Sequence, residues 1–442
     1  MADYIEPRVL KGFRDFLPGA ETVRRDLTEK IEKTFRSFGF VPIDTPALEY
    51  ANILLGKGGG ETEKQIYRFK DNGERDIAMR FDLTVPFARF TALHKGELLF
   101  PFKRYHIGKV WRGENTQRGR YREFTQCDFD IIGSDSPAAD FEILHLISAT
   151  MRNLGIDITI HVNHRGLFNR FLSYIGQFDK SVDILRTVDK LSKIGEAETQ
   201  KILSQLTGQE NSKKILDFTG AKGSYTDVLK HITELSGGKS PESERLELLK
   251  CFMDDVSGKE ANVFVLNPSI TRGLDYYTGV VFETFLNEMP DIGSICSGGR
   301  YDNLAELYSK DKDKISGVGT SIGLDRLIAA LESLKKLPSS GLNTVAIACV
   351  NTEHSGLYQA LADKMRGKGI SCEVFTDGGN DKQLVKQFVL AEKRGMRYVL
   401  IPGKNPLSDP VTLRDLTKRQ NTEHSADDVI TALNSLNETG KI

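Results

Sequence analysis

Apolar residues recur at helical spacing near the start of the chain and at strand spacing after it. Residues 22–38 carry an apolar residue at every fourth position: Val23, Leu27, Ile31 and Phe35. This spacing predicts an amphipathic helix that packs its apolar stripe on a sheet or on a partner subunit. From about residue 76 to 163 short β-like runs dominate: RDIAMRF, FKRYHIGKVW, REFTQCDFDII and DITIHV. They predict a sheet with helical stretches between some of its strands.

The pattern changes at residues 165–260, where lysine and glutamate become more frequent. The runs ILRTVDKLSKI, ETQKILSQL and ERLELLKCFM predict helices, so we expect this stretch to be a helical insertion. Strand-like segments return at residues 263–266 and 278–286. Residues 322–334 then predict a helix whose apolar residues share one face: Leu324, Leu327, Ile328 and Leu331.

A third pattern follows the stretch KKLPSSGLN, whose Pro, Ser and Gly content is typical of a linker. Strand-like VAIACV, CEVFT and YVLIPG alternate with helical patterns near residues 355–367 and 381–394. This alternation predicts a separate small α/β domain. The expected organisation is therefore a core of residues 1–334 interrupted by the insertion of residues 165–260, a linker of residues 335–343 and a second domain of residues 344–442.

Composition limits the possible partners only weakly. The formal net charge of 442 residues is −1 at pH 7, so a nucleic acid would have to be bound by local basic patches. The five cysteines are odd in number and scattered, which argues against a disulfide framework or a zinc site. No run approaches the ~18 apolar residues of a membrane span, and no signal-like apolar stretch begins the chain. We expect a cytoplasmic protein.

The segment with the most polar chemistry is residues 102–133, which we interpret as two strands joined by the loop GENTQRG. Side chains alternate between the two faces of a strand, so one face of the second strand should carry a set of functional groups. These are Arg122, Phe124, Gln126, Asp128 and Asp130. From the pattern alone, a charge-rich hairpin exposed to solvent is an equally good interpretation.

Three further segments have simple structural interpretations when taken alone. In FDLTVPFARF, Asp82 and Thr84 could cap the helix that follows. TRGLDYYTG, residues 271–279, could be an ordinary turn between strands. GVGTSIGLDRL, residues 317–327, nearly matches a dinucleotide fingerprint, but its glycine spacing is wrong and no βαβ unit follows.

Together these segments resemble the class II aminoacyl-tRNA synthetases, and the resemblance covers nearly the whole chain. Residues 102–133 look like motif 2 and residues 317–327 like motif 3, while a region ending at Pro46 looks like motif 1. TRGLDYYTG with SGGRYDNL, residues 297–304, resembles the signature of the histidyl-tRNA synthetase family. The resemblance implies an α/β (α+β) fold: a class II antiparallel sheet with flanking helices, a helical insertion and a C-terminal α/β anticodon-binding domain.

The resemblance also implies an ATP site, with Mg2+ accompanying the nucleotide. Arg112 would contact the α-phosphate, a role that suits the fixed donors and permanent charge of a guanidinium. Phe124 would stack on adenine, and Glu114 and Arg120 would contact the nucleotide from the loop. Arg326 would cover the other face of adenine and neutralise the γ-phosphate. No metal cage made by protein side chains alone is expected.

For the amino acid, the resemblance implies that Arg272 is catalytic, beside the carboxylate and the α-phosphate, and that Tyr276 and Tyr277 line an imidazole pocket. Neutral imidazole offers one donor and one acceptor, which a carboxylate and a hydroxyl can match. Asp130 and Tyr277 can supply them. Asp82 and Thr84, assisted by Gln126, would bind the α-amino group.

The activity implied is ATP-dependent activation of L-histidine to histidyl-adenylate and transfer to the 3′ end of tRNA(His), by a homodimer. The alternative is a non-catalytic relative, the regulatory subunit of ATP phosphoribosyltransferase. Such relatives usually lack the motif 2 residues, the histidine signature and the anticodon domain, whereas this chain has all three.

Overall fold

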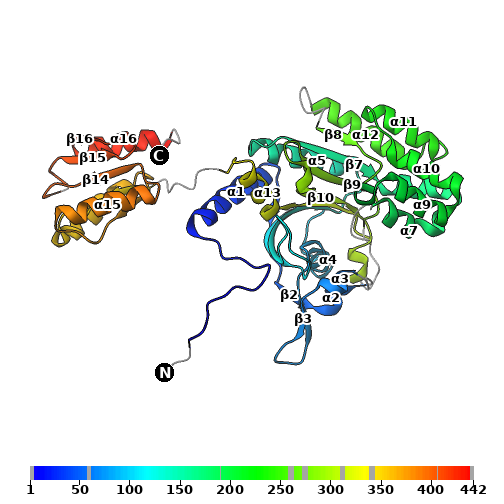
Figure 1. The fold of residues 1–442 in the computed structure, drawn as a ribbon, viewed down its shortest axis with the longest axis horizontal. Helices are drawn as coiled ribbons and strands as arrows, with labels where there is room; N and C mark the ends of the chain where they lie inside the picture. Colours follow the sequence, from blue (N-terminus) through cyan, green and yellow to red (C-terminus); the bar gives the residue numbers. More distant parts are fainter. Residues whose placement is uncertain are drawn as a thin grey trace. The chain divides into compact units, whose positions relative to one another are not determined.

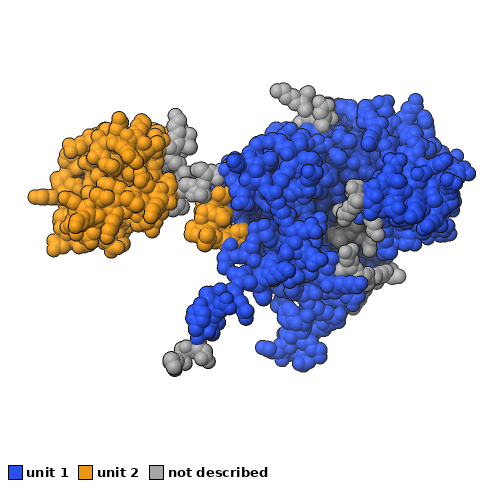
Figure 2. Space-filling model, viewed as in Figure 1, with its two compact units in different colours: residues 1–15, 24–337 blue, residues 16–23, 338–442 orange. Residues whose placement is uncertain are grey.

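The computed structural model describes residues 4–56, 61–189, 191–256, 263–270, 277–308, 314–337, 344–405 and 407–438. It divides into two compact units (Figure 2). Unit 1 comprises Met1–Asp15 and Arg24–Leu337, and unit 2 comprises Phe16–Val23 and Pro338–Ile442. Among the described residues, no helix is both long enough and apolar enough to cross a membrane.

An eight-stranded sheet forms the centre of unit 1 (Figure 1). Its strands, in spatial order, are β1 (Val41–Pro42), β5 (Phe102–Trp111), β6 (Glu123–Ile132), β11 (Gly317–Gly323), β10 (Cys296–Tyr301), β9 (Val280–Leu286), β7 (Ile158–His164) and β8 (Phe264–Leu266). Neighbours are antiparallel except at the two edges, where β1 pairs with β5 and β7 with β8 in parallel. The predicted antiparallel sheet is confirmed, with these two parallel edge strands added.

Several helices pack on strands of this sheet. The predicted apolar stripe of α1 (Pro18–Ser37) is buried, and the Phe35 ring packs on Phe129 of β6, 4.6 Å between centroids. Helix α5 (Pro137–Asn153) begins at Ser136, whose hydroxyl accepts a bond from the Ala138 amide, and it contacts β6 and β11. Helix α13 (Leu324–Ser333) contacts the same two strands. The helices thus bury their apolar faces against the strands that carry the candidate chemistry.

A second, three-stranded sheet has the order β2 (Leu48–Tyr50), β4 (Asp76–Met79) and β3 (Arg68–Lys70). Helices α2 (Ala51–Leu55), α3 (Glu61–Gln65) and α4 (Thr84–Leu93) accompany it. Helix α4 begins two residues after Asp82 and packs with the short turn η4 (Ala305–Tyr308). This packing places the start of α4 beside the large sheet.

The insertion is helical, as its pattern predicts. Its elements are α6 (Arg165–Tyr174), η1 (Phe178–Lys180), α7 (Ser181–Val188), α8 (Leu191–Ile194), α9 (Glu196–Thr207), α10 (Gln209–Gly220), α11 (Tyr225–Leu235) and α12 (Pro241–Val256). A core of stacked aromatic rings joins α6 to α10, with Phe171 and Phe218 centroids 4.5 Å apart. Helix α12 also packs on α5, which flanks the large sheet.

Unit 2 is a five-stranded α/β domain. Its sheet has the order β13 (Cys372–Val374), β12 (Val345–Ile347), β14 (Tyr398–Ile401), β15 (Val411–Asp415) and β16 (Gln420–His424). The short turn η5 (Thr352–His354) and helices α14 (Ser355–Arg366), α15 (Asp381–Lys393) and α16 (Ala426–Glu438) complete the domain, whose core they share with the sheet. The first three strands are parallel, as the alternating pattern predicts. The antiparallel pair β15–β16 was not predicted from the sequence.

Candidate active site

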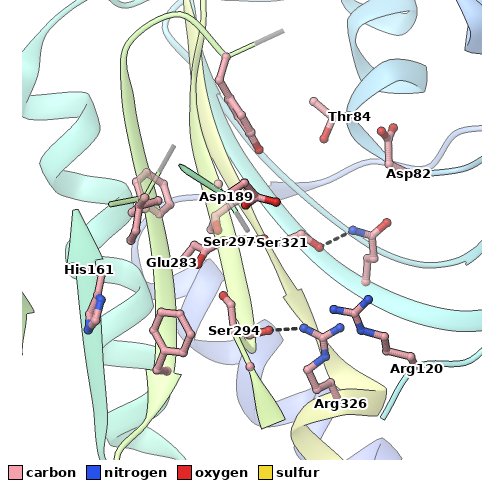
Figure 3. Close-up of a pocket in the computed structure, with 18 of the residues that line it drawn as sticks. Asp82, Thr84, Arg120, His161, Asp189, Glu283, Ser294, Ser297, Ser321 and Arg326 are labelled. Carbon is pink, nitrogen blue, oxygen red and sulfur yellow. Dashed lines mark hydrogen bonds between the residues drawn. The ribbon is translucent and has the colours of Figure 1, made fainter. Parts of the chain in front are cut away.

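A cavity of about 1480 Å³ opens over one face of the large sheet in unit 1. Its walls come from the β5–β6 hairpin, from β9, β10 and β11, from the start of α4 and from α7 of the insertion (Figure 3). Ligand pockets commonly have volumes of ~300–1,000 Å³, so this cavity has room for more than one small molecule.

Strand register aligns a row of polar residues across this sheet. The row runs from Asp128 on β6 through Ser321, Ser297 and Glu283 to His161 on β7. The last four residues line the cavity. Asp128 is buried, and this burial raises the pKa of its carboxyl to about 7. Four strands therefore contribute to one polar surface of the cavity, beside the buried Asp128.

At one end of the cavity, an arginine and two aromatic rings form a cation–π group. The guanidinium of Arg112 lies 4.3 Å from the Phe81 ring centroid and 5.1 Å from that of Phe124. Its Nε donates a hydrogen bond of 3.1 Å to the Phe81 carbonyl oxygen. Phe124 lines a smaller hollow of about 120 Å³ beside this arginine. A flat apolar plate next to a cation suits a purine nucleotide.

Two more arginines lie at this end. Arg326, in the first turn of α13, donates through Nη1 to the Ser294 carbonyl oxygen at 2.5 Å. Its burial lowers the pKa of the guanidinium to about 10, so it remains charged at neutral pH. Arg120 lies beside it (Figure 3), with Nη1 3.7 Å from a carboxylate oxygen of Glu114. Adjacent cations repel one another, and a polyanionic ligand would relieve this repulsion.

The N-terminal segment KGFRD contacts both α13 and the residue before β6, which carry side chains of this end of the cavity. Arg14 forms an ion pair with Asp325 of α13, and the other Asp325 oxygen accepts a 2.6 Å bond from the Thr125 amide of β6. The Gly12 carbonyl accepts a 2.9 Å bond from the Arg122 amide, just before β6. Gly12 has φ +89° and a Cβ there would lie 2.7 Å from the Arg122 side chain, so only glycine fits.

Arg122 does not join the predicted row of β6 side chains at the cavity. Its amide precedes β6, and its Nε donates at 3.2 Å to the Glu114 carbonyl oxygen. It therefore shapes the loop of the hairpin, whereas Gln126 and Asp130 line the cavity as predicted. The strand alternation that grouped these residues does not extend back to Arg122, because the strand begins at Glu123.

At the other end of the cavity, a buried ion pair holds Asp130. An Arg104 Nη atom lies 2.6 Å from one carboxylate oxygen, and the Tyr301 hydroxyl donates to the other at 2.6 Å. All three side chains are buried. Burial raises the pKa of the Asp130 carboxyl, and the Arg104 charge opposes this shift. A Cβ at Gly319 would lie 1.8 Å from the carboxylate, so this glycine makes room for it.

Asp82 and Thr84 reach the same end from the start of α4 (Figure 3). Asp82 is buried, its Oδ1 accepts a 2.9 Å bond from the Val85 amide, and burial raises the pKa of its carboxyl. Asp82 therefore accepts a bond from the first turn of α4, although Leu83 occupies the N-cap position, and Asp82 also lines the cavity. Gln126 donates from Nε2 to the Ser321 hydroxyl at 2.7 Å.

The structure brings most of the predicted site residues into these connected hollows. They are Asp82, Thr84, Arg112, Glu114, Arg120, Phe124, Gln126, Asp130, Tyr277 and Arg326. Arg272 and Tyr276 lie outside the described residues. Local sequence patterns do not indicate the roles of Arg104, Tyr301 and Glu283. They also do not indicate that insertion residues such as Arg165 and Asp189 contribute to the cavity wall.

Comparison with known proteins agrees with this geometry. The family model described as Histidyl-tRNA synthetase matches residues 12–327, and the model described as Anticodon binding domain matches residues 344–436. A histidine–tRNA ligase of Treponema denticola is 49% identical over 440 residues, 96% of this chain and 97% of the relative. That of Treponema pallidum strain Nichols is 47% identical over 436 residues, again 96% and 97%.

Solved structures give the same result for the fold. The crystal structure of histidyl-tRNA synthetase from Nostoc sp. PCC 7120 has a TM-score of 0.86 and 30% identity, and covers 97% of this chain and 99% of that one. A structure described as an ATP phosphoribosyltransferase regulatory subunit/histidyl-tRNA synthetase from Bacillus halodurans C has a TM-score of 0.75 and covers 90% of this chain and 99% of that one. At 19% identity it is similar in fold alone.

The antiparallel sheet, the arginine-bearing hairpin and the arginine at the start of α13 define a class II aminoacyl-tRNA synthetase. The matched family model and the full-length relatives narrow the class further. This chain belongs to the histidyl-tRNA synthetase family, with a C-terminal anticodon-binding domain. None of these comparisons favours the regulatory-subunit alternative.

Proposed function

We propose that this chain is a histidine–tRNA ligase, which activates L-histidine with ATP and transfers it to the 3′ end of tRNA(His). The observation that carries the proposal is a cavity that joins a cluster of arginines to buried carboxylates: Arg112, Arg120 and Arg326, then Asp82 and Asp130. Guanidinium groups suit a triphosphate, and carboxylates suit ammonium and imidazole N–H groups. Full-length relatives named for this activity support it.

In the first step, a carboxylate oxygen of histidine attacks the α-phosphorus of ATP. The new O–P bond forms as the bond to the bridging oxygen breaks, and pyrophosphate leaves. Arg112 and Arg272 would stabilise the charge on the α-phosphoryl oxygens, since guanidinium donors are fixed and always ionised. Phe124 would stack on adenine, with Arg326 on its other face, while Arg120 and Glu114 contact the nucleotide. Catalysis then consists of positioning and charge stabilisation, without a protein nucleophile.

Mg2+ would enter with ATP. Among the described residues, no group of three or more His, Cys, Asp or Glu could hold a metal ion. Two carboxylates of the nucleotide end, Glu114 and Glu283, line the cavity and interact electrostatically with Arg326. Carboxylate oxygens are ligands that Mg2+ accepts, usually together with substrate phosphates and water. When bound, the ion would offset phosphate charge during attack.

At the histidine end, Asp130 and Tyr277 would bind the imidazole, and Tyr276 would complete that pocket. Asp82 and Thr84, with Gln126, would bind the α-amino group. An amino acid without a matching donor and acceptor would not make these contacts with the pocket and would bind more weakly. Arg104 and Tyr301 would keep Asp130 oriented, because both contact its carboxylate.

In the second step, a ribose hydroxyl at the 3′ end of the tRNA attacks the adenylate carbonyl, and AMP leaves. We assign the core to residues 1–334, with the insertion at residues 165–260, and the anticodon domain to residues 344–442. We also propose a cytoplasmic homodimer that pairs through the region ending at Pro46. Exposed apolar side chains near that region support the dimer: Val41, Leu48 and Tyr50.

Pyrophosphate exchange into ATP, with each amino acid supplied separately and no tRNA present, tests this function. Exchange with histidine alone is expected, because the cavity pairs a nucleotide end with an imidazole-specific end. Exchange with a different amino acid would contradict the assignment of the histidine end. Absence of exchange with every amino acid would favour the regulatory relative.

A further inference from the structure

The segment SGGRYDNL carries two charged side chains that the proposed mechanism does not use. Tyr301 contacts Asp130, but Arg300 and Asp302 are absent from the residues that line the cavity. Arg300 is nevertheless buried, which is costly for a guanidinium unless it is paired. Its partners therefore indicate what this part of the histidine signature does.

Arg300 belongs to a buried triad that crosses from the catalytic sheet to the insertion. Asp140 of α5 accepts at Oδ1 from the Arg300 Nε, 2.8 Å away, and at Oδ2 from the Arg245 Nε of α12, 2.6 Å away. The Asp140 side chain is fully buried, while that of Arg245 is 15% exposed. Each arginine holds one oxygen, so loss of either one would leave the carboxylate half-satisfied.

On its other side, the triad reaches the end of the TRGLDYYTG segment. The Thr278 amide donates to the Arg300 carbonyl oxygen at 2.8 Å. The Thr278 hydroxyl donates to Asp302, and the second Asp302 oxygen accepts from Ser316, whose hydroxyl lies 2.5 Å from an Arg300 Nη. Thr278 directly follows Tyr277, a residue of the cavity wall.

Gly279 is part of the same arrangement. A Cβ on this glycine would lie 3.0–3.2 Å from the aliphatic carbons of the Arg300 side chain, so its absence lets the arginine pass. The Gly279 carbonyl also accepts a 2.9 Å bond from the Arg165 amide, at the first residue of α6. The insertion therefore contacts Gly279 directly through the Arg165 amide. Arg245, further along the insertion, is linked to the same segment only indirectly, through Asp140 and Arg300.

We infer that Arg245 of the insertion is a positioning residue for histidine binding, acting through Asp140 and Arg300 on the segment Tyr277–Gly279. This inference rests on the proposed function, since it takes Tyr277 to line the imidazole pocket. Arg245 touches no substrate in this scheme. Arg245 holds Asp140, and through Asp140 and Arg300 it orients the backbone that carries Tyr277. Loss of Arg245 should therefore weaken the binding of histidine more than the binding of ATP.

The test is steady-state pyrophosphate exchange with the full-length enzyme and the variant Arg245→Gln. The KM for histidine is expected to rise about tenfold, the size typical of one coupled contact, while the KM for ATP changes by less than about twofold. Lys250→Gln is the matched control, because Lys250 lies on the same helix in a surface pair with Asp254. It should leave both KM values unchanged.

Two more variants separate positioning from general loss of structure. Arg245→Lys restores a cation and should recover part of the histidine KM. Thr278→Val removes the hydroxyl contacts with Asp302 and with the Arg300 carbonyl oxygen but keeps the backbone bond between the Thr278 amide and Arg300. It should raise the histidine KM at an unchanged urea midpoint. Equal changes in both KM values, or an unchanged histidine KM in Arg245→Gln and Thr278→Val, would overturn the inference. Wild-type enzyme without histidine-dependent exchange would instead refute the proposed function.

Discussion

The two ends of the cavity, which we propose bind the nucleotide and histidine, hold their charges differently. At the nucleotide end, the Arg120 side chain is 41% exposed, and Arg112 and Arg326 are fixed by backbone carbonyls. At the histidine end, Asp130, Arg104 and Tyr301 are each at most 4% exposed and are fixed by one another. The negative charge of a triphosphate would neutralise these partly hydrated arginines only when the ligand binds. A small neutral side chain has to be recognised by groups whose charge is set before it arrives.

This difference has an energetic consequence. A buried ion pair adds little net stability, because desolvation offsets attraction, but breaking it by removing one partner is costly. An arginine that is partly hydrated can lose its ligand without such a cost. Substitutions at the histidine end should therefore affect folding and substrate binding together, whereas substitutions at the nucleotide end should affect catalysis and leave folding intact.

The largest effect is expected from Asp130→Asn. This change leaves the buried Arg104 charge without its carboxylate and should lower the free energy of unfolding by about 3–5 kcal/mol. Urea unfolding followed by tryptophan fluorescence measures it, because Trp111, the only tryptophan of the chain, is buried in β5. The histidine KM should rise as well.

A double variant, Arg104→Met with Asp130→Leu, is the control for that effect. Replacing both members of a buried pair by apolar groups of similar size is often nearly neutral for stability. The double variant should therefore recover most of the lost stability without recovering histidine binding. A loss of less than about 1 kcal/mol in Asp130→Asn would contradict the buried-pair account.

Arg112→Gln should leave folding intact and lower the rate of adenylate formation by about 10²–10³-fold, as expected for the loss of one donor that stabilises developing charge. Pyrophosphate exchange at saturating histidine measures the rate, and the urea midpoint measures folding. Lys109→Gln is a suitable comparison, since Lys109 is exposed near the end of β5, three residues before Arg112, and pairs with Glu123. Comparable losses in both variants would rule out a specific role for Arg112.

Much of the fold could be predicted because local patterns determine it. The strand predicted at residues 102–111 matches β5, and the stripe of α1 is buried as its spacing requires. Bounds in unit 2 differ from prediction by only a few residues, as for α15. Sequence periodicity indicates which face of a helix or strand is apolar. It predicts these elements well because each of them packs one apolar face against a core.

The partners of the buried groups could not be predicted in this way. Arg104 pairs with Asp130 because the β5–β6 hairpin is symmetric about Gln117, a register that the loop sequence alone leaves uncertain by a residue. Glu283 and His161 join the cavity through the order of strands in the sheet, which local patterns do not encode. Counting outward from the loop brings Arg104 close to Asp130 but does not decide between Asp130 and its neighbours on β6.

A smaller effect is expected from pH, which should change the free energy of unfolding through the buried Asp128 carboxyl. Burial raises the pKa of the Asp128 carboxyl to about 7, above its unfolded value near 4, so the folded state binds an extra proton between these values. Stability should therefore fall as pH rises through this window and level off above pH 7. The difference in unfolding free energy between wild type and Asp128→Asn should change by roughly 2 kcal/mol from pH 5 to 7. A pH-independent difference would contradict the shift.

The smallest effect is expected from Phe124→Leu at the nucleotide end. Leucine keeps the hollow apolar but removes the flat ring, so adenine loses its stacking surface while Arg112 and Arg326 still bind the phosphates. The KM for ATP should rise about tenfold, within the range for one stacked base, and the histidine KM should stay constant. Steady-state exchange with each substrate varied in turn measures both. If the histidine KM rose equally, the two ends of the cavity would not be independent, because Gln126 borders both hollows and would transmit the change.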